Sequence, residues 1–351
     1  MTLNASGPIS LAGSTTGQSI AVELGLGATT AISLNQAAVR TLAGIPSGAI
    51  IIPTNFWGKS AAISKKAIFG YGYNGGDLSI TNLVSNTGVV SLDTTGVGSA
   101  RAFLAASSYS TDKAIFGYGQ IVGSASITSL SNLVSNTGVV STDTAGVGTA
   151  RWYLGACSYG TDKGIFGYGS ASAGRTAVTN KVSNTGVIAG DTAGVGTLRT
   201  ATSATGYGTD KGIFGYGQTT ATIKLNTTNL ISNTGVASGD QTGVGSLMRY
   251  RSSAPYGTDK ALFGYGNTTT YTTITNLVSN TGVVAGDTNA AGTASSTRAA
   301  SNYGVDKAIF AYGTGAASSG SNLVSNLGAV AAAVTSVGTA RNNLAAAPYS
   351  S

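Results

Sequence analysis

The sequence has no histidine, a single cysteine, Cys157, and a single glutamate, Glu23, and only 9% of its residues are charged. Without histidine there is no Ser-His-Asp triad and no imidazole ligand for a metal ion. One cysteine forms neither an internal disulfide nor a thiolate metal cage, and one glutamate excludes catalysis by a pair of glutamates. The sequence therefore predicts a protein that is not an enzyme and that holds no metal and no cofactor.

Long apolar runs and a basic N-terminal leader are also missing. The densest apolar stretches, 49–52 and 329–334, are far too short to cross a bilayer. The N-terminus, MTLNASGPISL, lacks the basic segment of a secretory signal. These features predict a chain without a signal peptide that does not insert into a membrane.

Glycine, at 52 of 351 residues, and an internal repeat dominate the sequence. The string K-A-I-F-G-Y-G begins at Lys66 and returns in variant form every 47–50 residues. Each copy also carries variants of N-L-V-S-N-T-G and D-T-x-G-V-G-x-x-R, and six copies occupy residues 66–351. The sixth copy has Ala333 where the others have the aspartate of the third string.

Each copy contains about four short strand candidates. In the copy that starts at Arg101 they are Arg101–Tyr109, Lys113–Gly119, Leu133–Ser135 and Val139–Thr142. Four antiparallel strands in roughly 40–50 residues are typical of a β-propeller blade. Residues 61–351 therefore predict an all-β, six-bladed propeller.

The two ends of the repeat region are complementary. The repeats open in the second strand of a blade, and the chain ends in a lone first strand, 339–349. Pairing of that strand with Ala67–Tyr71 completes a sixth blade and leaves no exposed sheet edge. The alternative is an open β-solenoid, which needs no complementary ends.

Residues 1–60 do not repeat, and they predict a small α/β docking segment. The stretch Ser33–Gln36 reads as a capping box that opens a helix to about Leu42, before Gly44. Residues 18–24 predict another helical turn or two, and 49–53 predict a short strand. Because so short a segment has little core of its own, we expect it to dock on a larger body. The docking residues that we predict are Leu34, Val39, Leu42, Phe56 and Trp57.

Two parts of the chain resemble known families. An Arg-led strand followed by a hairpin into [K/G]-[A/G]-I-F-G-Y-G resembles kelch repeats and, more loosely, RCC1-like ones, with Gly-Tyr-Gly in place of the kelch double glycine and without the kelch tryptophan. The strings at Leu3–Ile20 and Ser33–Ile50, with N-F-W-G-K at Asn55–Lys59, resemble a module of tailed-bacteriophage tail-fibre and tail-tip proteins. This resemblance implies a virion protein, made in the host cytoplasm, that docks on other tail or baseplate proteins through residues 1–60.

The net charge of +7 raises the question of a polyanionic partner. Twelve of the 19 basic residues and ten of the 12 acidic residues recur at fixed repeat positions, however. We expect these to form hydrogen bonds and ion pairs between blades, and we do not expect nucleic acid as a partner. Arg175, Lys224 and Arg251 are among the basic residues that the pattern places outside this scaffold.

The connections between second and third strands vary in length and content, whereas the turns at the other end hardly vary. The residues that break the pattern in these loops are Tyr73, Asn74, Asp77, Arg175, Lys224 and Tyr271. Variable polar loops on a rigid scaffold are typical of a binding surface, and these side chains suit a host surface polysaccharide. The alternative is that the loops vary because nothing constrains them.

Three functions are therefore weighed. The first is a phage tail-fibre or baseplate protein that displays the propeller for host attachment. The second is a purely architectural protein that decorates the capsid or tail. The third, a glycan-cleaving propeller enzyme, has little support, because D-T-x-G-V-G is not the sialidase box and the tyrosine–glutamate nucleophile pair lacks its glutamate. No coiled-coil heptad supports any stoichiometry, so the sequence leaves a homo-oligomer open.

Overall fold

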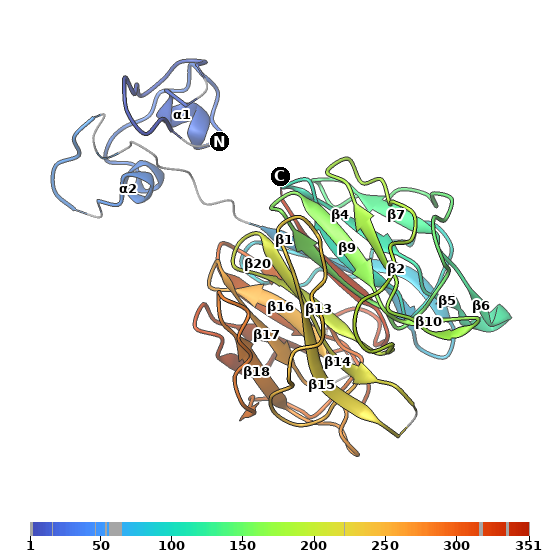
Figure 1. Ribbon diagram of the computed structural model, residues 1–351. Helices are drawn as coiled ribbons and strands as arrows, with labels where there is room; N and C mark the ends of the chain where they lie inside the picture. Colours follow the sequence, from blue (N-terminus) through green and yellow to red (C-terminus); the bar gives the residue numbers. More distant parts are fainter. Residues whose placement is uncertain are drawn as a thin grey trace. The chain divides into compact units, whose positions relative to one another are not determined.

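A computed structural model describes residues 3–15, 17–45, 47–52, 55, 65–220, 222–315, 319–334 and 337–350. The chain separates into two compact units, Met1–Ile63 and Ser64–Ser351 (Figure 1). The first unit contains two short helices, and the regular elements described in the second are β-strands, apart from one short 3₁₀ helix, η2 (Val122–Ser124).

The first unit packs two helices, α1 (Ile20–Glu23) and α2 (Ala37–Ala43), around a small apolar core. The Ser19 hydroxyl accepts a hydrogen bond from the Val22 N–H at 3.3 Å and so caps α1. Helix α2 ends at Gly44, whose φ of 73° is the left-handed geometry that glycine adopts without strain. The buried core residues are Leu3, Ile9, Ile20, Val39, Leu42 and Ala43.

Two predictions for this unit are wrong. Helix α2 begins at Ala37 without a side-chain cap, because the Ser33 hydroxyl accepts a bond from the Asn35 N–H in a local turn. No strand forms in 49–52, the described part of the predicted strand, and the Ile51 N–H donates instead to the Asn55 side chain at 2.6 Å. The described part of this unit is therefore helical and irregular rather than α/β.

Besides two two-stranded sheets, the described residues of the second unit form six antiparallel sheets of three or four strands, one for each repeat. Their strands, in order across each sheet, are β24 (Ala345–Tyr349), β1 (Lys66–Tyr73) and β2 (Asp77–Val84); β3 (Ala105–Tyr109), β4 (Lys113–Gly117) and β7 (Ser131–Val134); β8 (Gly155–Tyr159), β9 (Lys163–Gly167) and β12 (Thr179–Val182); β13 (Ser203–Tyr207), β14 (Lys211–Gln218) and β15 (Lys224–Ile231); β16 (Ser252–Tyr256), β17 (Lys260–Gly264), β18 (Ile274–Val278) and β19 (Thr288–Asn289); and β20 (Ala299–Tyr303), β21 (Lys307–Ala311), β22 (Ser321–Val324) and β23 (Val330–Val334). Two small hairpins, β5 (Gln120–Ile121) with β6 (Ser126–Ile127) and β10 (Ser170–Ala171) with β11 (Gly174–Arg175), lie in the loops between second and third strands.

The fourth strand is the main departure from the prediction, since four of these sheets contain only three strands. In the second repeat the segment after β7 pairs through isolated bridges such as Val134–Val140. Side chains take over part of the ladder: Asn132 Nδ2 donates to the Ser141 carbonyl at 3.0 Å, and the Ser141 hydroxyl accepts from the Leu133 N–H at 2.9 Å. The fourth segment therefore lies along the third strand without forming a regular strand.

The first strand is also shorter than predicted. Strand β3 begins at Ala105 rather than Arg101, because Phe103 has a φ of 59°, which interrupts extended backbone. The equivalent residue of every repeat has a similar positive φ; these residues are Phe103, Tyr153, Ala201, Tyr250, Thr297 and Asn343.

The C-terminal strand completes the first sheet, as predicted. Strand β24 pairs antiparallel with β1, from Lys66 opposite Tyr349 to Gly70 opposite Ala345. The first strands of the sheets are neighbours in the order β3, β8, β13, β16, β20, β24 and again β3. Each first strand therefore contacts two other first strands, and the series of contacts returns to β3.

Aromatic pairs hold neighbouring sheets together. The ring of Tyr71 meets the ring of Phe116 edge-on, with 5.1 Å between their centroids. The same contact recurs at every junction, in Tyr118–Phe166, Tyr168–Phe214, Tyr216–Phe263, Tyr265–Phe310 and Tyr312–Phe69. Glycine stands behind five of the six rings, because the space there is tight: a Cβ on Gly70 would lie 2.7 Å from Cζ of Phe116. The sixth position is Ala311.

A buried arginine accompanies each aromatic pair. The guanidinium of Arg101 lies 4.4 Å over the ring of Tyr71 in the preceding sheet, and it donates to Asn132 Oδ1 at 2.7 Å. Asn132 in turn donates to Asp143 at 2.9 Å. The arginines in this role are Arg101, Arg151, Arg199, Arg251, Arg298 and Arg341. These contacts confirm the predicted role between sheets for the recurring arginines and for the aspartates that they approach. For the recurring lysines the prediction is wrong, because four of them pair with the aspartate directly before them in the same hairpin, as Lys113 does with Asp112.

The placement of Arg251 outside this scaffold is wrong. Met248 and Ser295 occupy the repeat position of Arg101, so in these two repeats the guanidinium comes from Arg251 and Arg298, three residues later. The Arg251 side chain still reaches the equivalent asparagine of its repeat, and its Nη1 donates a hydrogen bond to Asn276 Oδ1 at 2.6 Å. Arg249, the arginine that the sequence pattern selects, lies instead 4.9 Å over the ring of Tyr250.

Candidate functional site

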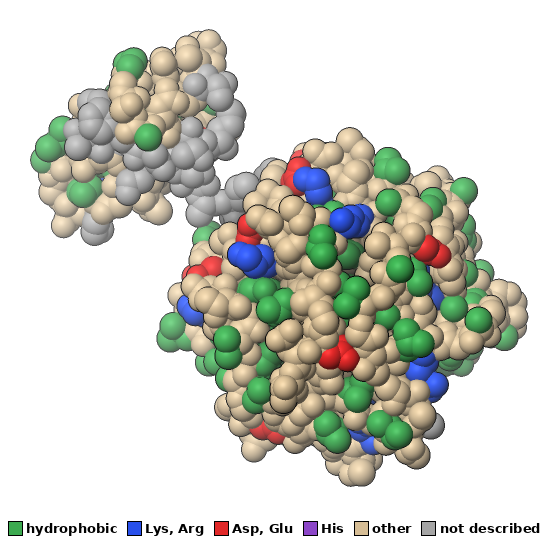
Figure 2. Space-filling model, in the orientation of Figure 1, with side chains coloured by type: hydrophobic (Ala, Val, Ile, Leu, Met, Phe, Trp, Pro, Cys, Tyr) green, Lys and Arg blue, Asp and Glu red, His purple; other side chains and the backbone are tan. Residues whose placement is uncertain are grey.

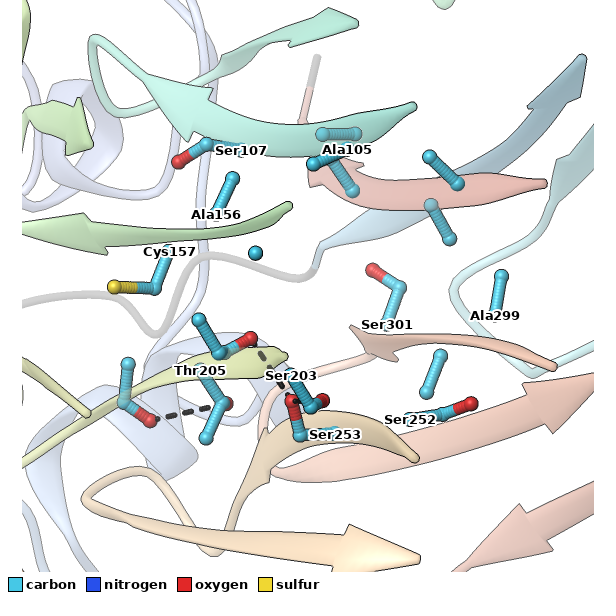
Figure 3. Close-up of a pocket in the computed structure, with 18 of the residues that line it drawn as sticks. Ala105, Ser107, Ala156, Cys157, Ser203, Thr205, Ser252, Ser253, Ala299 and Ser301 are labelled. Atoms are coloured by element: carbon cyan, nitrogen blue, oxygen red, sulfur yellow. Dashed lines mark hydrogen bonds between the residues drawn. The ribbon is translucent and has the colours of Figure 1, made fainter. Parts of the chain in front are cut away.

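The first strands of all six sheets line one central opening (Figure 3). Their sequences are AASSY, GACSY, SATGY, SSAPY, AASNY and AAAPY, so the lining consists of small side chains. Small residues are needed where six strands approach one another this closely. The volume of this part of the opening is about 160 Å³, and it continues into spaces of about 80 Å³ at one end and 180 Å³ at the other.

The chemistry of this lining is mostly neutral. The side-chain hydroxyls of Ser203 and Ser253, on neighbouring strands, form a hydrogen bond of 2.6 Å (Figure 3). Cys157 also lines the opening, and burial raises its pKa to about 12, so the thiol stays protonated at neutral pH. A protonated, buried thiol is a poor nucleophile.

A cycle of backbone hydrogen bonds surrounds one end of the opening. Tyr153 N–H donates to the Phe103 carbonyl, and Phe103 N–H donates to the Asn343 carbonyl, both at 2.9 Å. The bonds continue through the equivalent residues of the other repeats, Ala201, Tyr250 and Thr297, and return to Asn343. The positive φ of these residues turns each N–H toward the preceding repeat. The six hydrogen bonds therefore connect all six repeats.

Four aromatic side chains gather at this same end. The ring centroid of Phe103 lies 5.2 Å from that of Trp152 and 4.4 Å from that of Tyr153. The ring of Tyr153 lies 5.1 Å from that of Tyr250, and all four side chains are partly exposed. This cluster was not predicted from the sequence. A usable signal was present, because these bulky aromatics stand one or two residues after the repeat arginine, where the other copies have alanine, threonine or asparagine.

The variable loops lie at the same end as the aromatic cluster. Isolated bridges such as Trp152–Ser170 and Ala102–Gln120 join the segment before each first strand to the start of the next second-to-third loop. The predicted ligand residues are divided among these loops. Tyr73 forms an isolated β-bridge with Asn342, and Asn74 is exposed in the turn after β1. Arg175 is the last residue of the small hairpin β10–β11, and Lys224 is paired with Gln218 across β14 and β15. The side chain of Tyr271 is 45% exposed.

Asp77 has a structural contact in addition to its place in the loop. One of its carboxylate oxygens accepts a hydrogen bond from the Val122 N–H at 2.7 Å, in the loop of the next repeat. Its other oxygen is buried without a hydrogen-bond partner among the described residues. Asp77 therefore connects two neighbouring loops, which a sequence read one repeat at a time does not reveal.

Three of the five predicted docking residues belong to the core of the first unit or pack against it. Val39 and Leu42 are 0% and 5% exposed, and Leu34 packs against the same cluster. Phe56 and Trp57 lie outside the described residues. Among the described residues of this unit, the exposed large apolar side chains are instead Leu26 and Ile51, at 40% and 61%.

The opposite end of the sheets carries a regular set of exposed apolar side chains. Each stands next to the glycine of the hairpin turn between the third strand and the fourth segment of its repeat. These residues are Val89, Val139, Val187, Val236, Val283 and Leu327. All are at least 60% exposed. Elsewhere charged side chains are sparse, and on the face shown in Figure 2 they lie scattered among uncharged ones.

Comparison with known proteins gives no assignment, since no family model and no curated protein matches the chain. Within the described residues no group of three or more acidic or cysteine side chains is arranged to hold a metal ion. Neither described helix has the length and apolar character needed to cross a bilayer.

Proposed function

We propose that residues 65–350 form a closed six-bladed β-propeller with kelch-like blades, and that the chain is a tailed-phage virion protein that attaches to a host surface polysaccharide. Three cyclic relationships support the propeller: the order of first strands, the aromatic pairs at every junction, and the backbone bonds through Phe103 and its equivalents. The sequence resemblance of residues 1–60 to phage tail proteins supports the virion.

The observation that carries the attachment function is the coincidence of two features at one end of the unit. The aromatic cluster of Phe103, Trp152, Tyr153 and Tyr250 lies where the variable second-to-third loops also meet. Aromatic rings pack against the apolar faces of sugar rings, while loop amides, hydroxyls and Arg175 form hydrogen bonds to sugar hydroxyls. The central opening is too narrow for a polysaccharide, so the ligand binds across this rim.

The first unit is the docking part in this proposal. Because Val39 and Leu42 are buried in its own core, docking on other tail or baseplate proteins uses its exposed apolar residues, Leu26 and Ile51. The alternative function is a purely architectural capsid or tail protein. The regular exposed valines at the opposite end favour it, since a repeating apolar rim suits contact with another virion protein.

A glycan array with the full chain tests the attachment function. We expect binding to a surface polysaccharide that falls at least tenfold in the Trp152→Ala and Tyr271→Ala variants. The matched control is Val283→Ala, an exposed apolar residue at the opposite end, which keeps full binding. Absence of binding, or equal loss in the control, favours the architectural alternative.

Labelling of virions with an antibody against residues 65–350 tests the location separately. Tail or baseplate labelling supports a fibre or baseplate protein, whereas capsid labelling supports decoration. If purified particles carry no label, the chain is not a virion component.

A further inference from the structure

Five of the six sheet junctions bury part of an aspartate carboxylate in the same set of donors. In the second repeat Asp143 accepts hydrogen bonds from the Ser99 N–H at 3.0 Å, the Ser99 hydroxyl at 2.6 Å and Asn132 Nδ2 at 2.9 Å. The buried guanidinium of Arg101 lies 4.0 Å away. The aspartates in this position are Asp93, Asp143, Asp191, Asp240 and Asp287.

The sixth junction has the donors but not the carboxylate. Ala333 pairs with Asn322 in β23, the register that Asp143 has with Asn132, and its side chain is exposed. Thr293 follows Gly292 as Ser99 follows Gly98, so it presents the equivalent N–H and hydroxyl, and it is exposed. Among the described residues, neither of these Thr293 groups has a hydrogen-bond partner.

The asparagine and the arginine of this junction also have unused donors. Asn322 Nδ2 donates one bond, to the Ala331 carbonyl at 3.0 Å, whereas the equivalent Asn132 amide donates to both Ser141 and an aspartate. Arg298 is 4% exposed, and its Nη2 donates to Asn322 Oδ1 at 2.9 Å. Its Nη1 has no partner among the described residues, and burial lowers its pKa only to about 10, so the guanidinium carries its charge at neutral pH. Its Nε also lacks a partner among these residues, as it does in Arg151, Arg199 and Arg251 at filled junctions, so Nη1 is the donor that distinguishes this junction.

We propose that the sixth junction is a binding site for a carboxylate group, which accepts hydrogen bonds from Thr293 and Asn322 and offsets the charge of Arg298. We expect the bound carboxylate to take the position of the aspartate carboxylate in the five filled junctions. One of its oxygens would accept a hydrogen bond from the Thr293 hydroxyl, and the other would accept one from the Asn322 side-chain amide. A carboxylate fits better than a halide, because two oxygens are needed to satisfy donors on both sides. At two filled junctions the aspartate side chains, Asp143 and Asp240, are 26% and 31% exposed, so a ligand reaches this place from solvent.

The carboxylate has two sources, a free small acid or an acidic side chain of another protein. Acetate is the probe for the first source, and a capped Gly-Asp-Thr tripeptide, the sequence 286–288 of the fifth repeat, is the probe for the second. We expect acetate to bind with a dissociation constant on the order of millimolar. Tripeptide binding at least tenfold tighter than acetate assigns the site to a protein partner, and equal or weaker binding assigns it to free acids.

The variant that decides the question is Ala333→Asp, which supplies the missing carboxylate from the chain itself. In the native chain, acetate at about ten times its dissociation constant raises Tm by about 2–5 °C relative to chloride at equal ionic strength. In Ala333→Asp the starting Tm is higher and the acetate effect disappears. The matched control, Ala332→Asp, adds the same charge at the neighbouring position and keeps the acetate effect.

A direct titration of ¹³C-acetate by NMR, compared between the native chain and Thr293→Val, completes the test. We expect at least threefold weaker binding once the hydroxyl is removed, and this measurement does not depend on how Ala333→Asp folds. The proposal is overturned if the native chain binds neither probe, or if Ala333→Asp and Thr293→Val bind acetate as the native chain does.

Discussion

The guanidinium of Arg298 donates to Asn322 Oδ1 at 2.9 Å, the contact that Arg101 makes with Asn132, although Arg298 starts three residues later in its repeat. The contact is conserved in space between repeats whose sequences place the arginine differently. The position of the charge between the sheets, rather than its position along the chain, is therefore what each repeat maintains.

Removal of a scaffold arginine should be among the most destabilising single changes. Arg101→Ala leaves Asn132 Oδ1 and the Tyr118 carbonyl without their donors in a buried place, and we expect the free energy of unfolding to fall by about 3–5 kcal/mol. Denaturant unfolding measures this. Lys113→Ala removes a solvent-exposed ion pair with Asp112 and should change it by less than about 1 kcal/mol. Similar losses in both variants contradict the scaffold role.

The C-terminal strand should be required for a closed unit. A chain ending at residue 338 lacks β24, which leaves the β1 edge from Lys66 to Gly70 unpaired and free to pair with another chain. We expect it to associate in size-exclusion chromatography. A synthetic peptide of residues 339–350, added in excess, should restore the behaviour of the full chain. A truncated chain that stays monomeric with an unchanged Tm contradicts this prediction.

The glycines behind the junction rings should not accept a methyl group freely. A Cβ at Gly117 would lie 2.8 Å from Cζ of Phe166, so Gly117→Ala should lower the free energy of unfolding by about 1–3 kcal/mol. The sixth sheet shows how the ring yields: it has Ala311 at this position, and its Phe69–Tyr312 centroid distance is 5.6 Å rather than the 5.1 Å of Tyr71–Phe116.

Gly190→Ala is the matched control for this glycine, because a Cβ there meets nothing within 4 Å. We expect it to change the free energy of unfolding by no more than about 0.5 kcal/mol. If Gly117→Ala is equally silent in denaturant unfolding, the ring contact does not require glycine.

Stability should fall in acid because of the junction aspartates. For Asp143, burial raises the pKa, but the bonds from Ser99 and Asn132 and the charge of Arg101 outweigh it, so the pKa lies below its ordinary value. The pKa values of Asp93, Asp191, Asp240 and Asp287 are lowered in the same way. A carboxyl with a lowered pKa stabilises the fold above its unfolded pKa of about 4, and this contribution disappears as pH falls through the folded pKa.

We therefore expect Tm, followed by circular dichroism, to be nearly constant from pH 7 to 5 and to fall steeply below about pH 4. Asp143→Asn should start with a lower Tm at pH 7 and lose less on acidification. Asp210→Asn, which removes only a surface ion pair with Lys211, should follow the native acid curve. An acid curve that is unchanged in Asp143→Asn contradicts the assignment.

Much of the β-structure could be predicted from the repeat. Each copy carries its own pairing information, so the hairpin from β3 to β4 and the pairing of β24 with β1 were readable from residue order alone. The candidate site was predicted only in part. The variable loops were identified, but Phe103, Trp152, Tyr153 and Tyr250 were not, because their contacts join different repeats.

The sequence by itself determined the number of repeats, the β-class, the strand that joins the two ends, and the missing aspartate at Ala333. Only the tertiary structure decided that Arg251 rather than Arg249 enters the scaffold, that Val39 and Leu42 are core, and that the sixth junction keeps its donors. The physical reason is one of distance. Strand pairing is encoded by residues close in sequence, whereas the end point of a long side chain depends on neighbours that the chain brings together from another repeat.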